Sequence, residues 1–150
     1  MNIELLTFYI VVLIIIVSVA IVSIVVFFAD KQPDIRFSKD FIQITGMFGM
    51  IIHHAEIASV IMTNDKLPSM FKTWGLCFLG INKGDFDIYD KNEEYEVGEG
   101  CKLYTQTNKP PFILITLTND LKIFINFRNK TLMEKYYSEL LEYGKTENKN

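Results

Sequence analysis

Cysteine is scarce in this chain. The two cysteines, Cys77 and Cys101, lie apart, without a C-x-x-C spacing or a nearby histidine. This spacing does not match the ligand pattern of a structural zinc site. We therefore expect two free thiols in a reducing compartment, with the alternative that an extracytoplasmic domain pairs them across neighbouring strands.

Long runs of lysine and arginine are also missing, and the formal net charge is −3 at pH 7. No basic block is long enough to follow the phosphates of a nucleic acid or to form a polybasic membrane patch. We therefore expect no nucleic-acid partner.

Catalytic and metal-binding patterns are few. His53, His54 and Glu56 could suggest a metal cluster, but on a strand only His54 and Glu56 would share a face, and two ligands do not make a site. Gly75 and Gly80 imitate the start of a phosphate loop, but Ile-Asn follows where Lys-Ser/Thr would be needed. We expect no enzyme activity and no catalytic residue, bound metal or cofactor.

Two further groups of residues have simple interpretations. The acidic residues within 85–99 lack the spacing of a calcium loop and predict a solvated edge, which repels an anionic membrane leaflet or contacts a basic partner. The aromatic side chains Phe71, Trp74 and Phe78 are expected in the core or at the rim of a barrel.

The chain also contains one long hydrophobic run, residues 5–28, with no charge inside it. As a helix this run would reach roughly 36 Å, enough to cross a hydrocarbon core of about 30 Å with some tilt. Lipid offers the backbone no hydrogen-bond partners, so a lone segment must satisfy its own as a helix. We expect residues 5–28 to bind the lipid bilayer as a single transmembrane helix.

The flanks of the run favour a retained anchor over a cleaved signal peptide. The residues before it include Glu4 and no lysine or arginine, and no small-x-small cleavage pattern follows it. Lys31, Arg36 and Lys39 come after the run, which predicts an N-terminus outside the cell membrane and a cytoplasmic C-terminal domain.

Beyond the anchor we expect a polar linker over residues 29–37, one domain over 38–144 and a polar tail over 145–150. The domain shows short segments rich in Ile, Val, Phe and Thr between turn residues, the pattern of a mainly β fold. The candidate segments, from which we expect about seven strands, are residues 41–44, 47–52, 55–62, 75–79, 85–89, 102–107, 111–117 and 121–127. Residues 80–84 are expected to connect two of these strands.

The last part of the domain changes to helical periodicity. Leu132, Tyr136, Leu140 and Tyr143 recur at helical spacing in residues 130–145. Thr131 and Glu134 fit a capping box. The sequence predicts one amphipathic helix that closes an open end of a small barrel or sandwich, with capping preferred to glycosylation at Asn129.

Several short motifs occur in a defined order and spacing over residues 37–143. They are Leu67-Pro68, Trp74-Gly75, Gly84-Asp85-Phe86, Leu103-Tyr104, Ile125-Asn126, Thr131, Tyr136 and Leu140. In their order and spacing, these motifs resemble the bacterial pleckstrin-homology (PH) domain family found in small membrane proteins. The resemblance implies a bent antiparallel barrel capped by a C-terminal helix.

These observations leave three hypotheses for function. The first is a membrane-tethered, non-catalytic PH-like module that binds an unidentified membrane or cytoplasmic protein or peptide. The second is an enzyme, for which we find no supporting motif. The third is a structural subunit that packs through its transmembrane helix. Phosphoinositide binding is not expected, because the 44–47 turn of the first hairpin has no basic cluster.

Overall fold

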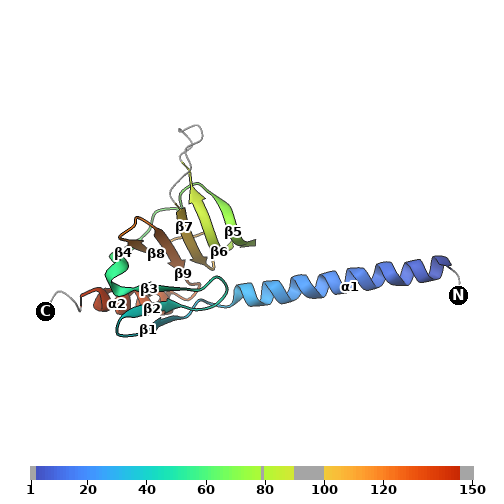
Figure 1. The fold of residues 1–150 in the computed structure, drawn as a ribbon, viewed down its shortest axis with the longest axis horizontal. Helices are drawn as coiled ribbons and strands as arrows, with labels where there is room; N and C mark the ends of the chain where they lie inside the picture. Colours follow the sequence, from blue (N-terminus) through green and yellow to red (C-terminus); the bar gives the residue numbers. More distant parts are fainter. Residues whose placement is uncertain (1–2, 79, 90–99, 146–150) are drawn as a thin grey trace. The chain divides into compact units, whose positions relative to one another are not determined.

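The computed structural model describes residues 3–78, 80–89 and 100–145. It divides into two compact units, Met1–Lys31 and Gln32–Asn150. The first unit is the helix α1, and the second contains two β-sheets and the helix α2 (Figure 1).

Helix α1 spans Ile3–Asp30 and includes the whole predicted anchor. Its residues Ile3–Phe28 are long and apolar enough to cross a membrane. The hydroxyl groups of Thr7, Ser18 and Ser23 each donate to the carbonyl oxygen four residues earlier, at 2.8 to 3.0 Å. The serine and threonine hydroxyls of the run thus find hydrogen-bond partners within their own helix, as a hydrocarbon environment requires.

Strand β1, Ile35–Phe37, lies within the segment that the sequence predicted as a linker. The backbone oxygen of Asp34 accepts hydrogen bonds from the backbone N and the hydroxyl of Thr45, at 2.8 and 3.1 Å. The Asp34 carboxylate accepts a third bond from the Tyr136 hydroxyl at 2.7 Å. The chain is therefore fixed to the second unit from Asp34 onward.

The strands form two open sheets. A three-stranded antiparallel sheet has the order β1-β2-β3, and a six-stranded sheet has the order β4-β8-β9-β7-β6-β5. Strand β7 pairs with β9 in parallel, and the other pairs are antiparallel. The remaining strands are β2 Phe41–Ile44, β3 Met50–His53, β4 Ile57–Thr63, β5 Met70–Phe78, β6 Ile81–Ile88, β7 Gly100–Thr105, β8 Phe112–Leu117 and β9 Lys122–Asn126.

The mainly β domain with one C-terminal helix is confirmed, and the finer barrel architecture is not. The described residues contain nine strands where about seven were expected. The resemblance implied antiparallel pairing throughout, whereas β7 and β9 are parallel. Across the described strands the six-stranded sheet ends at β4 and β5 and does not close into a barrel.

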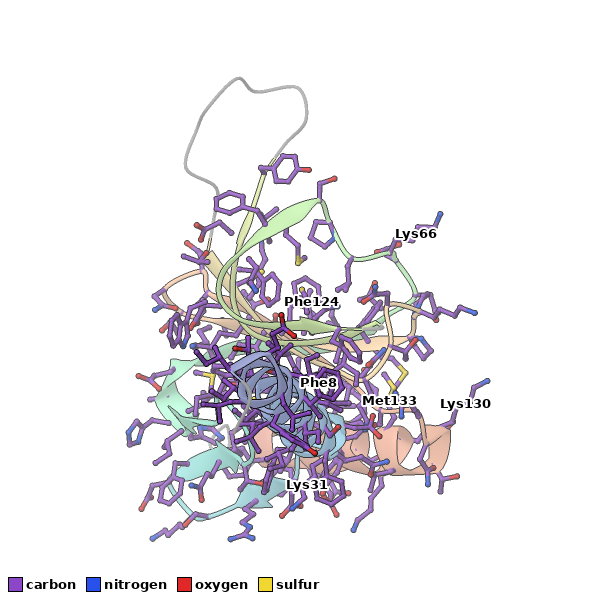
Figure 2. The ribbon with its side chains drawn as sticks, turned by 90° about the vertical axis from the view of Figure 1, so that its right-hand side faces the viewer. Phe8, Lys31, Lys66, Phe124, Lys130 and Met133 are labelled. Carbon is purple, nitrogen blue, oxygen red and sulfur yellow. The ribbon has the colours of Figure 1, made fainter. Side chains whose placement is uncertain are left out.

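The six-stranded sheet buries apolar side chains on both faces. One face packs against the three-stranded sheet and α2, through Ile113, Ile123 and Met133 among others. The other face carries a second cluster made by Phe86, Cys101, Leu103, Phe112 and Phe124. In Figure 2, Phe124 and Met133 mark these two clusters on opposite sides of the sheet.

Helix α2 spans Lys130–Lys145, as the periodicity predicted. Its apolar stripe is buried at Met133, Tyr136 and Leu140. The predicted capping residue is wrong by two positions, because the Asn129 side chain accepts a hydrogen bond from the backbone N of Leu132 at 3.2 Å. Asn129 thus caps the helix.

The predicted connection over residues 80–84 is also wrong, since Ile81 begins β6. Gly75 and Gly84 are direct partners in the β5–β6 ladder and have φ angles of +144° and +123°. A Cβ atom on Gly75 would lie 2.1 Å from the backbone oxygen of Lys83. The two glycines therefore let the backbones of β5 and β6 approach more closely than any side chain would allow.

Candidate binding groove

A groove of about 530 Å³ lies beside the second apolar cluster. Residues from the β4–β5 connection, from β5, β6 and β7, and from the β7–β8 connection form it. Its volume falls within the range of about 300 to 1,000 Å³ that is typical of ligand sites. We call it the lysine-rimmed groove, after the residues described next.

The floor of the groove is apolar. Phe86 and Leu103 are buried. They lie on the same face of the sheet, because Phe86 pairs with Cys101 and Leu103 is two residues further along that strand. Leu67 and Met70 pack against them from the β4–β5 connection and the start of β5. The floor can therefore contact aliphatic groups of a ligand.

Three lysines from separate parts of the chain line the rim. Lys66 belongs to the β4–β5 connection, Lys72 to β5 and Lys109 to the β7–β8 connection. All three are exposed, and Lys66 extends outward in Figure 2. The described lining residues include no carboxylate, so the groove carries positive charge on a chain whose formal charge is negative. The rim suits an anionic partner.

Buried Asn126 fixes the wall that carries Lys109. The Asn126 side-chain oxygen accepts from the backbone N of Gln106 and Thr107, at 2.9 and 3.3 Å. Its amide nitrogen donates to the backbone oxygens of Thr107 and Lys109, at 2.9 and 3.0 Å. Asn126 is 1% exposed. Four hydrogen bonds from one buried amide thus hold the β7–β8 connection in a defined shape.

A second amide, Asn82, also lines the groove. Its nitrogen donates to the Asn108 side-chain oxygen, and its oxygen accepts from the Cys77 thiol at 2.9 Å. These contacts join β5, β6 and the β7–β8 connection. The groove is thereby held at both walls before any ligand arrives.

The histidine pair occupies a different structure from the predicted strand. His54 and Glu56 belong to a single 3₁₀ turn, η1, which spans His54–Glu56, so the shared strand face does not exist. A ring nitrogen of His54 lies 2.8 Å from the backbone oxygen of Tyr143 in α2, and Glu56 accepts from the backbone N of His53 at 2.8 Å. Across the described part of the chain, no three His, Cys, Asp or Glu residues gather where they could hold a metal ion.

The two cysteines are free, as expected, and the fold keeps them apart. Cys77 of β5 pairs with Asn82 of β6, and Cys101 of β7 pairs with Phe86 of β6. Strand β6 therefore lies between the two cysteines, and their partners on it are four residues apart. Two strand spacings and four residues separate them by roughly 16 Å, too far for a disulfide. The alternative of pairing across neighbouring strands is therefore wrong. Burial raises the pKa of the Cys101 thiol to about 12.

The aromatic side chains expected in the core or at the rim of a barrel are exposed, so the core alternative is wrong. Trp74 is 69% exposed, Phe71 51% and Phe78 39%, all on β5 at the edge of the six-stranded sheet. Of the acidic segment 85–99, Asp85 and Asp87 lie in β6, and residues 90–99 lie outside the described part of the chain. Asp85 forms an ion pair with Lys102.

No local sequence pattern indicates the lysine-rimmed groove, because its lysines are far apart in the chain and come together only through the strand order. The position of Asn126, a polar residue at the end of an apolar strand, was a weak indication of a structural role. Comparisons of the chain with protein-family models, curated proteins and solved structures found no significant match.

Proposed function

We propose that this chain is a single-pass membrane protein whose β-domain binds an anionic segment of a partner protein or peptide in the lysine-rimmed groove, without catalysis. The observation that carries the proposal is the groove itself, with three lysines around an apolar floor. An extended segment that combines acidic and aliphatic side chains matches both features.

The anchor supplies the rest of the mechanism. Helix α1 is apolar enough to hold the domain at a membrane, where confinement raises its effective concentration for another membrane protein. A weak contact at the groove is then sufficient for binding. Lys31, Arg36 and Lys39 follow α1 and support a cytoplasmic domain with the N-terminus outside.

The PH-like family remains part of this proposal. The helix that follows the last strand supports it, and the parallel pairing of β7 with β9 counts against it. The basic residues that we propose for binding line the lysine-rimmed groove and not the first hairpin, Phe41–His53. The proposal therefore depends on the groove and not on the family.

The proposal is tested by binding of a defined probe to the full chain in nanodiscs of zwitterionic lipid. The probe is a fluorescent dodecapeptide that alternates glutamate and leucine, compared with the same peptide carrying lysine in place of glutamate. Fluorescence anisotropy should show binding of the acidic peptide only, weakened by salt because the rim is exposed.

Charge reversal locates the site. Lys72→Glu replaces a favourable contact of up to about 1 kcal/mol by repulsion, so the affinity should fall about tenfold. Lys39→Glu, an exposed lysine before β2 that does not line the groove, is the matched control and should leave the affinity unchanged. Equal effects of the two variants would reject the groove as the site.

A further inference from the structure

A second surface, on the opposite face of β5, has no role in the groove. It consists of Phe71, Trp74 and Phe78 from β5 and Tyr89 after β6, and we call it the aromatic face. These side chains are 39% to 69% exposed. Phe71 and Tyr89 contact each other, with ring centroids 6.4 Å apart. Contiguous exposed aromatic side chains mark an interaction surface.

The strand register separates this face from the groove. Phe71, Trp74 and Phe78 lie opposite Asp87, Asp85 and Ile81 of β6, which alternate along one face. Lys72 and Cys77 lie opposite Phe86 and Asn82, which line the groove on the other face. A ligand in the groove therefore leaves the aromatic face uncovered.

The edge of β5 is poorly suited to adding a strand from another chain. A register shift interrupts the ladder between Lys72 and Trp74, and Gly75 bends the strand directly after it. Irregularities of this kind protect edge strands from pairing. The side chains of the aromatic face, and not its backbone, must therefore make the contact.

The covalent tether of the domain is short. Helix α1 ends at Asp30, and Asp34 is already fixed by Thr45 and Tyr136. The four peptide units from Asp30 to Asp34 reach about 14 Å at most. If α1 spans a bilayer, the attachment point at Asp34 stays within that distance of the end of the helix.

A chain of contacts within the second unit links this attachment point to the aromatic face. Thr45, which holds Asp34, opens the β2–β3 connection, and the Phe48 backbone oxygen in that connection accepts a hydrogen bond from the Tyr104 hydroxyl. Tyr104 pairs with Lys83, which pairs with Leu76 between Trp74 and Phe78. Two strand spacings, about 10 Å, separate Tyr104 from β5.

From the tether and these contacts we infer that the aromatic face packs against the membrane interface. Tryptophan and tyrosine are enriched at this depth, where their rings meet apolar chains and their polar atoms stay near water. The Asp85–Lys102 ion pair offsets one carboxylate beside the face, whereas Asp87, opposite Phe71, keeps part of the repulsion from an anionic leaflet that the sequence predicts. The inference therefore concerns a zwitterionic interface. The inference rests on the proposed function only in requiring that α1 spans the bilayer.

The test uses the only tryptophan of the chain, Trp74, as its probe. The full chain is placed in phosphatidylcholine nanodiscs, with and without brominated acyl chains, at one chain per disc. Bromine quenches tryptophan on contact, so Trp74 should lose about half of its emission or more in the brominated discs if it lies at the interface.

A matched control moves the probe to the other edge of the sheet. Trp74→Phe combined with Ile61→Trp places the tryptophan on β4, five strands from β5, at a site that is 48% exposed. This probe should show little quenching. In the original chain, Phe71→Ser with Phe78→Ser should reduce the quenching of Trp74, and both positions are exposed enough to preserve folding.

Three results would overturn the inference. Trp74 could remain unquenched while the chain copurifies with the discs, in which case the anchor stands and only the interface contact fails. Trp74 could be shielded from aqueous iodide without bromolipid quenching, which would indicate a second protein surface. The two probes could be quenched equally. A chain that does not copurify with the discs would reject the proposed function as well.

Discussion

Replacing Asn126 by alanine tests whether a single buried amide holds the wall of the lysine-rimmed groove. Asn126→Ala removes four hydrogen bonds to the β7–β8 connection. Each contributes about 1 kcal/mol net, and water recovers part of the loss because Thr107 and Lys109 are near the surface. We expect the free energy of unfolding to fall by about 2 to 3 kcal/mol.

The assay is a thermal melt of the second unit in nanodiscs, followed by near-ultraviolet circular dichroism of its tyrosines. For a domain of this size the melting temperature should fall by about 10 °C. Binding of the acidic peptide should weaken too, because the backbone that positions Lys109 loses its support.

Asn119→Ala is the matched control for this experiment. Its side chain accepts one exposed hydrogen bond, from the backbone N of Leu121 at 3.2 Å. The expected cost is about 0.5 kcal/mol. If Asn126→Ala were no more destabilising than Asn119→Ala, the reasoning about the groove wall would be refuted.

Three other predictions concern the rest of the domain. The hydrogen bond from Tyr136, and to a smaller extent that from Arg36, holds the pKa of Asp34 below its usual range. The stability that ionised Asp34 contributes is therefore present above about pH 4 and is lost as pH falls through the lowered pKa. Tyr136→Phe should lower the free energy of unfolding by about 1 kcal/mol at neutral pH and weaken the loss of stability at acid pH. An unchanged dependence of stability on pH would contradict the role given to the Tyr136–Asp34 hydrogen bond. Gly75→Ala should lower the free energy of unfolding by more than about 2 kcal/mol in chemical denaturation, whereas Gly144→Ala, with open space around it in α2, should raise it by up to about 1 kcal/mol. Maleimide should modify Cys77 in the folded chain and Cys101 only after unfolding, as mass spectrometry would show, and rapid modification of both would contradict the burial of Cys101.

Local periodicity predicted the helices well. The apolar run 5–28 and the stripe through Leu132, Tyr136 and Leu140 each contain their own signal, and α1 and α2 contain these segments in full. Asn129 was missed as the cap because Thr131 and Glu134 offered a competing capping box, whereas α2 begins at Lys130, directly after Asn129.

Long-range pairing limited the prediction of the sheets. Residues 80–84 have turn-like composition, yet Gly84 pairs directly with Gly75 inside a bent ribbon. Phe71, Trp74 and Phe78 have the composition of a core strand, but the strand order places β5 at an edge. Exposure depends on what packs over a strand, and the local sequence does not contain that information.

The candidate site depends on the same long-range pairing. Lys66, Lys72 and Lys109 form no local pattern. Asn126 has its role only because strand pairing brings the end of β9 next to the β7–β8 connection. The reasoning applied to His53, His54 and Glu56 fails, since a 3₁₀ turn replaces the strand on which it depended.

The most direct test of the account is whether a partner occupies the lysine-rimmed groove in the membranes where the chain resides. Cys77 lines the groove and is the exposed cysteine, so its rate of modification by maleimide reports occupancy. We predict slower modification in native membranes than in purified nanodiscs, and recovery of the faster rate in the Lys72→Glu variant. Equal rates in both preparations would contradict the central claim.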